Sequence, residues 1–386
     1  GNASRVRIVR ERAMPSVLIV GAGINGLCTG WALVRRGWQV TILEAGTVPN
    51  PHAASSDHHR LIRRQYSDPG YAARVGQAFA AWDRLWKDLG AQHYVPRGML
   101  ALSREAGDWT DRCRAALEDT GQPHEVLPRD TVARRFPTYA TDRVRYGLFS
   151  AAGGALLSDR ILVALAAWLT ARGARIETQT PVAHVDPESG SVTAGGRTRS
   201  ADAVILAAGV GLPALDPAIA QACTPCRVTV VYANPPAHLA AAWAEAPCWT
   251  DLGGSDDLWG MPPMLGLPAK LGVGALTVPH DPAEREVEEP QITRAILEAY
   301  ADRFTDGHLF EPVRTHVNYY LRAPDEAFLL RRSGRIFSLT ADSGHGFKFG
   351  ALTGEDVAEA VDGGDVHRVA ARLAGREGLS LASGSA

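Results

Sequence analysis

The sequence predicts a protein of the α/β plus α+β class, with a Rossmann-like domain built from discontinuous segments and a second domain around a mixed β-sheet. Three observations support this class. A strand, a glycine-rich turn, a helix and a second strand follow one another from Ser16 to Glu44, which is the organisation of a βαβ unit. A similar buried strand, AVIL, returns only at residues 203–206, and residues 213–290 contain many prolines among irregular apolar runs. The chain is therefore expected to leave the first domain and return to it later.

These observations divide the 386 residues of the chain. The Rossmann-like domain is expected at 14–90, 146–215 and 325–375, the second domain at 91–145 and 216–324, and loose termini at 1–13 and 376–386. Apolar residues at helical spacing predict a helix that ends at Arg36 and helices at 71–89, 158–172, 291–304 and from 349 onward. Short apolar runs predict strands at 16–20, 39–43, 95–102, 174–177, 181–185, 191–194, 203–207, 227–233, 270–277, 313–321 and 335–339.

Composition argues against several classes of function. The formal net charge is −2, with 46% hydrophobic and 21% charged residues, so no overall field favours nucleic acid or an anionic membrane surface. No run of about 20 apolar residues is present that could cross a membrane. Five scattered cysteines favour a reducing, cytoplasmic setting, and Cys223 and Cys226 lack the second pair that a zinc site requires. We expect no metal and no nucleic-acid partner, and either a monomer or a homodimer.

The turn GAGING has the spacing G-x-G-x-x-G. Between a strand and a helix, Gly21 would make the tight turn, Gly23 would let the backbone approach a pyrophosphate, and Gly26 would let the helix pack on the sheet. Free N–H groups and the dipole at the helix N-terminus would stabilise the phosphates. Glu44, at the end of the next strand, would accept hydrogen bonds from ribose hydroxyls. The expected dinucleotide-binding residues of this unit also include Ile24, Asn25 and Ala45.

The chain after Glu44 does not continue as a simple NAD dehydrogenase would. A polar loop rich in His and Arg follows, PHAASSDHHRLIRRQY, and the sheet resumes far downstream. A nucleotide domain assembled from separated segments is the layout of flavoproteins of the amino-acid oxidase type. Lysine usage adds a second signal, because only Lys87, Lys270 and Lys348 occur among 40 basic residues. An ammonium group on a flexible stem is not replaced well by a guanidinium, so Lys270 and Lys348 are candidates for chemistry.

The chain resembles the FAD-dependent sarcosine oxidase-like branch of the D-amino-acid oxidase superfamily. The matching stretches span nearly the whole chain in the family's order: VLIVGAGINGL, SSDHHRLIRRQY, GALLSDR, ADAVILAAG, LPAKLGVG, APDEAFLL and SGHGFKFG. The resemblance implies oxidation of a carbon–nitrogen bond in an amino acid, often a secondary or N-methylated one. It also implies that hydride passes to FAD, that the imine hydrolyses, and that O₂ reoxidises the flavin to give hydrogen peroxide.

The resemblance implies a substrate pocket as well. Lys348 in SGHGFKFG is similar to the lysine that binds the substrate carboxylate, Arg63 in RLIR would join it, and Trp259 and Tyr320 fall at positions of pocket aromatics. A carboxylate in a pocket needs compensating charge, which an arginine and a lysine provide. If the RLIR stretch were helical, Arg60 and Arg63 would share one face. Cations near the amine would also lower its pKa and favour the reactive neutral form.

The flavin side of the expected site follows from the same resemblance. Lys270 in LPAKLGVG matches the lysine that activates oxygen through a water, and Arg60 would lie close to the flavin ring, so Lys270, Arg60 and His59 are the candidate catalytic residues. A fixed cation stabilises negative charge on oxygen more strongly in a dry site than in water. Further cofactor contacts are expected from His59, Arg60, Val182, Ala208, Gly209, Gly344, His345, Gly346, Phe347 and Lys348.

Three positions depart from the family pattern. Asn318 stands where some relatives carry the cysteine that bonds FAD, so we expect non-covalent FAD, with a histidyl link at His58 or His59 as the alternative. Gly274 stands where sarcosine oxidases carry a pocket histidine, which suggests a roomier or differently polar pocket and argues against sarcosine itself. His59 stands where some relatives have threonine, and its role stays open.

Other functions stay open from the sequence. The chain could be a dehydrogenase that passes electrons to a quinone or carrier, although Lys270 favours oxygen, or an oxidase of primary D-amino acids or glycine. An aromatic-ring monooxygenase that uses NAD(P)H would need a flavin-side motif unlike SGHGFKFG. A nucleotide-binding subunit without chemistry of its own would have no need to keep Arg63, Lys270 and Lys348 together.

Overall fold

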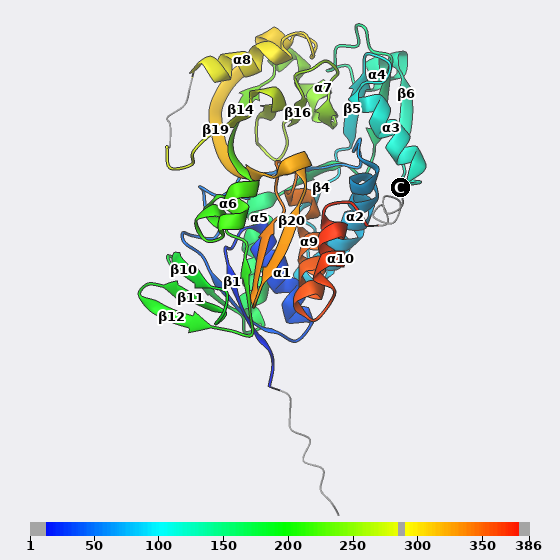
Figure 1. Cartoon of the computed structure of the whole chain (residues 1–386). Coiled ribbons are helices and arrows are strands. Elements are labelled where there is room, and N and C mark those ends of the chain that lie inside the picture. The colour runs from blue at the N-terminus through cyan, green and yellow to red at the C-terminus, as the bar shows by residue number, and fades with distance from the viewer. Residues whose placement is uncertain (1–12, 285–289, 378–386) are drawn as a thin grey trace, which may run out of the picture.

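The computed structural model describes residues 13–284 and 290–377, which form two lobes (Figure 1). The lower lobe in this view carries the first strand and the last helices, and the upper lobe is formed mainly by the middle of the chain. Most of the two expected loose termini lies outside the described residues. Arg376 and Glu377, which were expected to be loose, instead form ion pairs with Asp325 at 3.4 Å and with Arg372 at 3.1 Å.

In the described residues, the lower lobe is built on a six-stranded sheet. Its strand order is β20 (Leu329–Ser333), β21 (Ile336–Thr340), β13 (Ala203–Leu206), β1 (Ser16–Val20), β2 (Gln39–Leu43) and β9 (Arg175–Glu177). β1 pairs in parallel with β2 and with β13, and β13 pairs in parallel with β21, whereas β20 is antiparallel to β21. The predicted return of the chain at AVIL is confirmed, because this segment lies directly beside β1.

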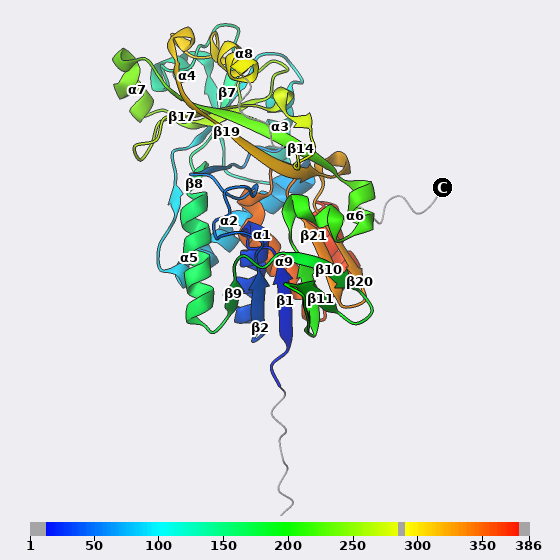
Figure 2. The ribbon, with the colours of Figure 1, turned by 90° about the vertical axis from the view of Figure 1, so that its left-hand side faces the viewer.

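Alternating residues of β1 show how the two faces of this sheet are covered. Val17 and Ile19 belong to a core cluster shared with the helices α1 (Ile24–Arg35), α2 (Pro69–Leu89), α5 (Ser158–Ala171), α9 (Gly350–Val361) and α10 (Val366–Leu373). Leu18 and Val20 pack on the other face with the antiparallel strands β10 (Val182–Asp186), β11 (Ser191–Ala194) and β12 (Arg197–Ser200) (Figure 2). Successive side chains of a strand point to opposite faces, so a strand buried on both sides is a continuous apolar run.

A mixed sheet, nine-stranded in the described part of the chain, forms the upper lobe. Its order is β18 (Val278–Pro279), β14 (Thr224–Asn234), β17 (Ala269–Val273), β16 (Leu258–Met261), β15 (Cys248–Asp251), β5 (Met99–Ser103), β7 (Tyr146–Ser150) and β6 (Glu125–Pro128), with β19 (Glu311–Arg322) paired to β14. β15 and β5 run parallel, and β14 is antiparallel to both β17 and β19. The expectation of a mixed sheet in the second part of the protein is confirmed.

Aromatic side chains fill the core of the upper lobe. Trp243, Trp249, Tyr300 and Phe304 are all at most 2% exposed and belong to one cluster. They lie on or beside α7 (Ala240–Ala244), β15 and α8 (Pro290–Tyr300), while α4 (Arg129–Arg135) adds Val132. α3 (Trp109–Asp119) packs on β5 and β7 in a smaller cluster. The remaining short elements are α6 (Pro217–Ala222) and 3-10 turns at Gly209–Ala214, Ala237–Leu239, Gly274–Leu276, Gly307–Leu309, Pro324–Glu326 and Phe347–Phe349.

Several expected element boundaries are wrong for identifiable reasons. RLIR begins a strand, β3 (Arg60–Ile62), because it pairs antiparallel with β8 (Gly154–Leu156), which also pairs with β4 (Tyr94–Val95). The strand expected at 95–102 is split into β4 and β5 around Gly98, whose φ is +83°. The strand expected at 270–277 ends at Val273. Residues 146–150, expected in the first domain, form β7 of the upper sheet because they pair with β5 and β6.

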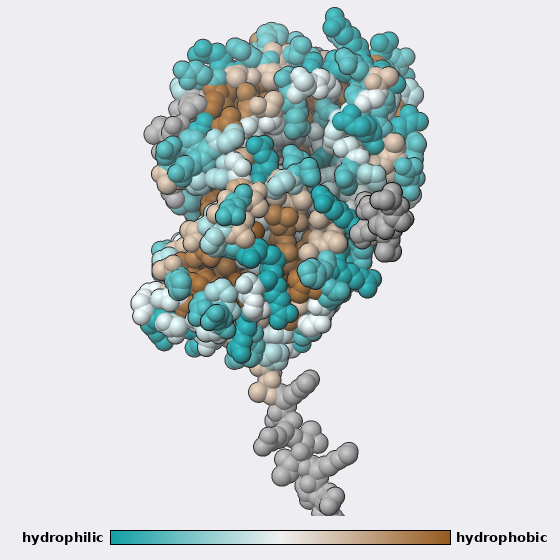
Figure 3. Space-filling model, viewed as in Figure 1, coloured by the Kyte–Doolittle hydropathy of each residue, from teal (hydrophilic) through white to brown (hydrophobic). Residues whose placement is uncertain are grey.

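The surface shown in Figure 3 is largely hydrophilic, with smaller apolar areas between the polar side chains. No helix among the described residues combines the length and the apolar character that a membrane span requires.

Candidate active site

The glycine turn leaves no room for side chains between β1, α1 and β13. Gly21 has a φ of +108°, and a Cβ built on it would lie 2.3 Å from the backbone oxygen of Ala207. A Cβ on Gly26 would lie 1.9 Å from the backbone oxygen of Gly21. Gly23 is the N-cap of α1 and has no side-chain cap, while the N–H of Ile24 donates to Ser55 Oγ at 3.0 Å. The turn therefore has the close-packed backbone that the motif predicts at a helix N-terminus.

Glu44 at the end of β2 closes this turn from the other side. Its carboxylate accepts from the Ala22 N–H at 2.8 Å, from the Gly46 N–H at 2.8 Å and from Asn50 Nδ2 at 3.0 Å. Because a carboxylate offers about four acceptor positions, one remains for a ribose hydroxyl. Ala45, next to it, is exposed.

The residues at this end of the sheet fit a dinucleotide. Asn25 Oδ1 is buried and has no hydrogen-bond partner in the described part of the chain, which leaves an acceptor at the start of α1. Ala208 and Gly209 follow β13 at the same edge, and Val182 packs with Ala208 on the cluster beside β1 and β2. FAD would therefore be held by the turn at 21–26, Glu44 and the ends of β10 and β13.

The segment SGHGFKFG lies next to the start of α1. Asn25 Nδ2 donates to the Ala341 backbone oxygen at 3.2 Å, which connects the two segments. A Cβ on Gly346 would lie 1.9 Å from that same oxygen, and one on Gly344 would lie 3.0 Å from the ring of Tyr320. The ring of Phe347 stacks on Trp82 of α2 with centroids 6.3 Å apart.

One cavity of about 690 Å³ brings most of the predicted site residues together. The predicted residues that line it are Ile24, Asn25, Arg60, Arg63, Trp259, Lys270, Tyr320, Gly344, His345, Gly346, Phe347 and Lys348. The wall thus combines residues of the α1 turn, of the upper sheet and of SGHGFKFG. The residues expected at the far end of the nucleotide (Glu44, Ala45, Val182, Ala208 and Gly209) do not line it.

Arg63 and Lys348 approach this cavity around Tyr66. The guanidinium carbon of Arg63 lies 4.3 Å and the Nζ of Lys348 5.7 Å from the centre of the Tyr66 ring. Arg63 donates to the Gln65 backbone oxygen and to Thr250 Oγ1, both at 3.0 Å, and Lys348 Nζ donates to the His345 backbone oxygen at 3.0 Å. Neither cation has a carboxylate partner among the described residues. Burial and the charge of Arg63 hold the pKa of Lys348 well below its usual range.

Arg60 and Arg63 both line the cavity but have different hydrogen-bond partners, and β3 is a strand and not the helix that would have placed both on one face. Its Nη2 donates to the backbone oxygens of Ala54 at 2.5 Å and Ser56 at 3.1 Å, and its Nη1 lies 3.3 Å from Asp57 Oδ2. Arg60 thereby orders the 54–57 loop, which passes along the same cavity.

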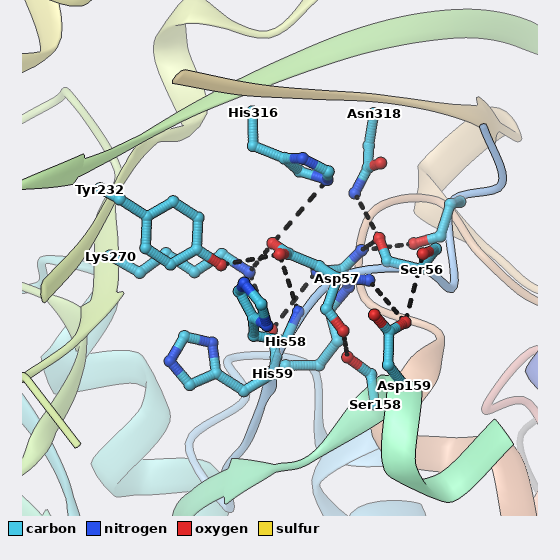
Figure 4. Close-up of polar contacts among 12 residues, drawn as sticks. Ser56, Asp57, His58, His59, Ser158, Asp159, Tyr232, Lys270, His316 and Asn318 are labelled. Carbon is cyan, nitrogen blue, oxygen red and sulfur yellow. Dashed lines mark hydrogen bonds and ion pairs between the residues drawn. The ribbon is translucent and has the colours of Figure 1, made fainter. Parts of the chain in front are cut away.

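Lys270 lies in a buried polar cluster centred on Asp57 (Figure 4). Its Nζ is 2.7 Å from Asp57 Oδ2 and donates to the His59 backbone oxygen at 2.8 Å. The hydroxyl of Tyr232 donates to Asp57 Oδ1 at 2.8 Å, and His316 Nε2 lies 3.9 Å from Asp57 Oδ2. Sequence reasoning did not find Asp57, Tyr232 or His316. These residues are far apart in the sequence and meet only in the fold, where β14, β17, β19 and a loop bring them together.

His59, a predicted catalytic and cofactor-contact residue, is buried beside Lys270. Its side chain is fully buried, both ring nitrogens lack a partner within the described residues, and it does not line the cavity. The ring stacks on Tyr232 with centroids 6.1 Å apart. Burial and the charge of Lys270 lower the pKa of His59 to about 3, so the ring is neutral.

The opposite wall of the cavity carries the aromatics and one unexpected acid. Tyr320 and Trp259 are half-buried and line it, as predicted. Gly274 does not simply enlarge the pocket, because a Cβ built there would lie 1.9 Å from Asp257 Oδ2. Asp257, with a φ of +54°, fills the space that a side chain at 274 would take.

Comparison with known proteins places this geometry in a family. The chain matches the family model of the FAD dependent oxidoreductases (DAO) over residues 16–360. The chain belongs to this family. Human peroxisomal sarcosine oxidase is 24% identical over 357 residues, with 89% of this chain and 91% of the human one covered. The mouse peroxisomal sarcosine oxidase is 28% identical over 148 residues, which is 38% of each chain.

A solved structure agrees with the fold of this oxidoreductase. The open form of the Tyr258Phe mutant of NikD, an unusual amino acid oxidase essential for nikkomycin biosynthesis, superposes with a TM-score of 0.77 at 22% identity. It covers 92% of this chain, which covers 97% of NikD. The protein is thus an FAD-dependent oxidoreductase of the sarcosine oxidase type, a group that acts on carbon–nitrogen bonds of amines.

Proposed function

We propose that the protein is an oxidase of an amine that carries a carboxylate, with a secondary or N-methyl amino acid as the preferred substrate. The observation that carries the proposal is that Arg63 and Lys348 line one cavity and that neither forms an ion pair with a carboxylate of the described chain. A fork-shaped guanidinium and a compact ammonium together suit a substrate carboxylate. The walls of Tyr320 and Trp259 suit an apolar or aromatic body.

The site's own residues would prepare the substrate for oxidation. Bound FAD would accept a hydride from the carbon next to nitrogen, which converts the amine into an imine. Water would then hydrolyse the imine. The two cations fix the carboxylate, which orients that carbon toward SGHGFKFG. Their field also lowers the pKa of the substrate amine and favours its neutral form.

Lys270 is proposed to serve the second half of the reaction, in which O₂ takes the electrons and gives hydrogen peroxide. The carbonyl of His59 and the carboxylate of Asp57 fix its ammonium group at the cavity wall. A fixed cation with little exposure stabilises negative charge that develops beside it. Arg60 is proposed to lie at the flavin ring and His59 to support the same wall.

FAD is proposed to bind without a covalent bond. Asn318 takes the position expected for a linking cysteine, and its Nδ2 lies 3.5 Å from the Ser56 backbone oxygen. Acid precipitation should release all of the flavin into the supernatant. Flavin that stays with the denatured protein would contradict this and direct attention to His58 and His59. We also propose a division into an FAD-binding domain (14–90, 151–215 and 325–375) and a substrate domain that includes residues 146–150.

The test of the function is a peroxide-release screen over N-methyl, cyclic, D- and L-amino acids, with the flavin spectrum recorded. The expected substrates bleach the flavin without air and release peroxide in air, and amines without a carboxylate do neither. Lys270→Met should slow flavin reoxidation far more than flavin reduction. Equal effects on both half-reactions, or equal turnover of amines without a carboxylate, would contradict the proposal.

A dehydrogenase that passes electrons to a quinone is the second candidate. One observation favours it, namely that the carboxylate of Asp57 partly neutralises the charge of Lys270. The same screen with a soluble quinone in place of air separates the two candidates, because a dehydrogenase bleaches with substrate and then reoxidises faster with quinone than with O₂.

A further inference from the structure

Lys270 and Asp57 form an ion pair at the cavity wall that is almost completely shielded from solvent. Their side chains are 1% and 2% exposed, and Nζ lies 2.7 Å from Oδ2. A buried ammonium group is costly unless it is paired and hydrogen-bonded. The two hydrogen-bond acceptors of Lys270 are Asp57 and the backbone of His59.

The groups around Lys270 are otherwise neutral or positive. Arg60 at the start of β3 and Arg314 from β19 carry positive charge, with Arg314 Nη2 3.7 Å from Asp57 Oδ1. His59, His316 and Tyr232 are neutral near pH 7, because burial lowers the pKa of each histidine and raises that of Tyr232. The ring of His58 lies edge-on to that of Tyr232, with centroids 6.0 Å apart, and is exposed. β16 faces Lys270 with Met261. Asp57 is therefore the counter-charge of this cation in the described chain.

The position of Asp57 is itself fixed by its backbone. Its N–H donates to Asp159 Oδ1 at 3.1 Å, and its carbonyl accepts from Ser158 Oγ at 2.6 Å, both at the start of α5. Its carboxylate also accepts from the His58 N–H at 2.7 Å and from Tyr232 at 2.8 Å. These bonds come from His58, from β14 and from the start of α5, so contacts other than that with Lys270 also hold Asp57 in place.

We propose that Asp57 is a positioning residue for Lys270: its carboxylate keeps the lysine protonated and holds Nζ at the cavity wall beside His59. This inference rests on the proposed role of Lys270 in reoxidation of the flavin. Without Asp57, desolvation together with Arg60 and Arg314 would favour the neutral amine. With Asp57 in place, burial lowers the pKa of Lys270 to about 8, which leaves the ammonium form dominant at pH 7.

The alternative is a purely structural role, in which the cluster ties the 54–59 loop to the upper sheet. In that case an Asp57 variant loses stability, and the protonation of Lys270 does not change. A measurement of protonation therefore separates the two roles better than a measurement of stability does.

The scarcity of lysine makes this measurement direct. With ¹³C at the Cε of lysine, the holoenzyme gives one NMR signal each for Lys87, Lys270 and Lys348, assigned with Lys270→Met and Lys348→Met. The wild-type Lys270 signal should be that of an ammonium group at pH 7. In Asp57→Asn it should shift to the neutral form, with a midpoint at least one pH unit lower. Asp159→Asn is the matched control, because it removes a neighbouring negative charge while the asparagine Oδ1 can still accept from Asp57 N–H and Ser56 Oγ. The Lys270 midpoint should stay.

A second readout follows the reaction itself and does not depend on the amine. Enzyme reduced with dithionite is mixed with O₂ at a series of pH values. Asp57→Asn should react at least tenfold more slowly than wild type at pH 7 and recover as the pH falls and Lys270 regains its proton. Lys270→Met should be slow at every pH.

The outcomes separate this inference from the proposed function. An unchanged titration midpoint of Lys270 in Asp57→Asn overturns the inference. A neutral Lys270 in the wild type at pH 7 overturns it as well, and this second result does not depend on whether the variant folds. A shifted midpoint with an unchanged rate of O₂ reaction overturns the part that concerns oxygen. A failed substrate screen, by contrast, would remove the proposed substrate class and leave both measurements unaffected.

Discussion

The guanidinium of Arg63 and the ammonium of Lys348 lie 4.3 and 5.7 Å from the ring centre of the same residue, Tyr66. Arg63 follows β3 in the first part of the chain, and Lys348 lies just before α9 at its end. Two cations held against one buried ring, with no carboxylate in ion-pair contact with either among the described residues, form a candidate anion site.

Removal of one of these cations should weaken anion binding. Lys348→Met should raise the Kd of simple carboxylates such as benzoate about tenfold to a hundredfold, since a hydrogen bond to a charged group contributes about 1.5–3 kcal/mol. The measurement is a titration of the flavin spectrum. Lys87→Met, at an exposed position of α2, is the control and should bind carboxylates like wild type. If Lys348→Met did so too, Lys348 would not belong to the anion site.

The glycine turn should tolerate no Cβ at Gly26. In Gly26→Ala the methyl group would lie 1.9 Å from the Gly21 oxygen, and relief of such overpacking costs about 1–3 kcal/mol or more. We expect at least tenfold weaker FAD binding in fluorescence titrations of the apoprotein. Gly211→Ala, whose Cβ would meet its neighbour at an ordinary 3.8 Å, should bind FAD normally. Equal affinities of the two variants would argue against a tight turn.

Stability should depend on pH through His345. Its Nε2 donates to the Glu326 oxygen at 2.8 Å and its Nδ1 accepts from Tyr66 at 2.9 Å, and burial lowers its pKa to about 3. Between that pKa and the unfolded value of about 6.5, only the unfolded chain binds the proton, so the wild type loses about 1.4 kcal/mol of stability per pH unit on acidification from this group.

The contribution of His345 can be isolated by a difference. Asp342 and Asp251 have raised pKa values of about 7 and about 6, so their effect on stability has the opposite sign. Urea unfolding of wild type and His345→Gln at pH 6 and pH 5, with FAD at fixed excess, removes these common terms. The difference in the free energy of unfolding between wild type and His345→Gln should shrink by about 1.4 kcal/mol from pH 6 to pH 5. A constant difference in the free energy of unfolding would mean that the His345 ring is protonated in the folded protein.

A buried ion pair between helices should contribute more than an exposed one. Arg74 of α2 and Asp356 of α9 lie 2.5 Å apart with side chains 5% and 7% exposed. Arg74→Met leaves Asp356 with only Arg372 and should cost about 3–5 kcal/mol in urea unfolding. Arg84→Ala removes an exposed partner of Glu355 on the same two helices and should cost about 1 kcal/mol or less. Similar losses would show that burial of the pair does not matter.

Local patterns predicted those parts of the site that lie within one short segment. The turn at 21–26 and the SGHGFKFG segment carry their own geometry, because glycines at fixed positions leave few backbone paths. Asp57 was missed for the opposite reason. Its partners Tyr232, Lys270 and His316 lie on three strands of the upper sheet, and nothing in the spacing of DHH indicates that they will meet.

Tertiary pairing also explains the errors in secondary structure. RLIR has no strong strand signature, and its extended form depends on β8, which is far along the chain. As a result Arg60 and Arg63 make different contacts: both line the cavity, but only Arg60 orders the 54–57 loop. β7 was assigned to the wrong lobe because a short apolar run does not reveal which sheet it joins.

The three lysines have one practical consequence. Lys270 and Lys348 are 1% and 6% exposed, whereas Lys87 lies open on α2. A dye or tether that reacts with side-chain amines at neutral pH should therefore attach at Lys87 and spare the cavity. Among the lysine side chains, Lys87 therefore offers an attachment point outside the cavity, through which the enzyme could be coupled to an electrode or a bead.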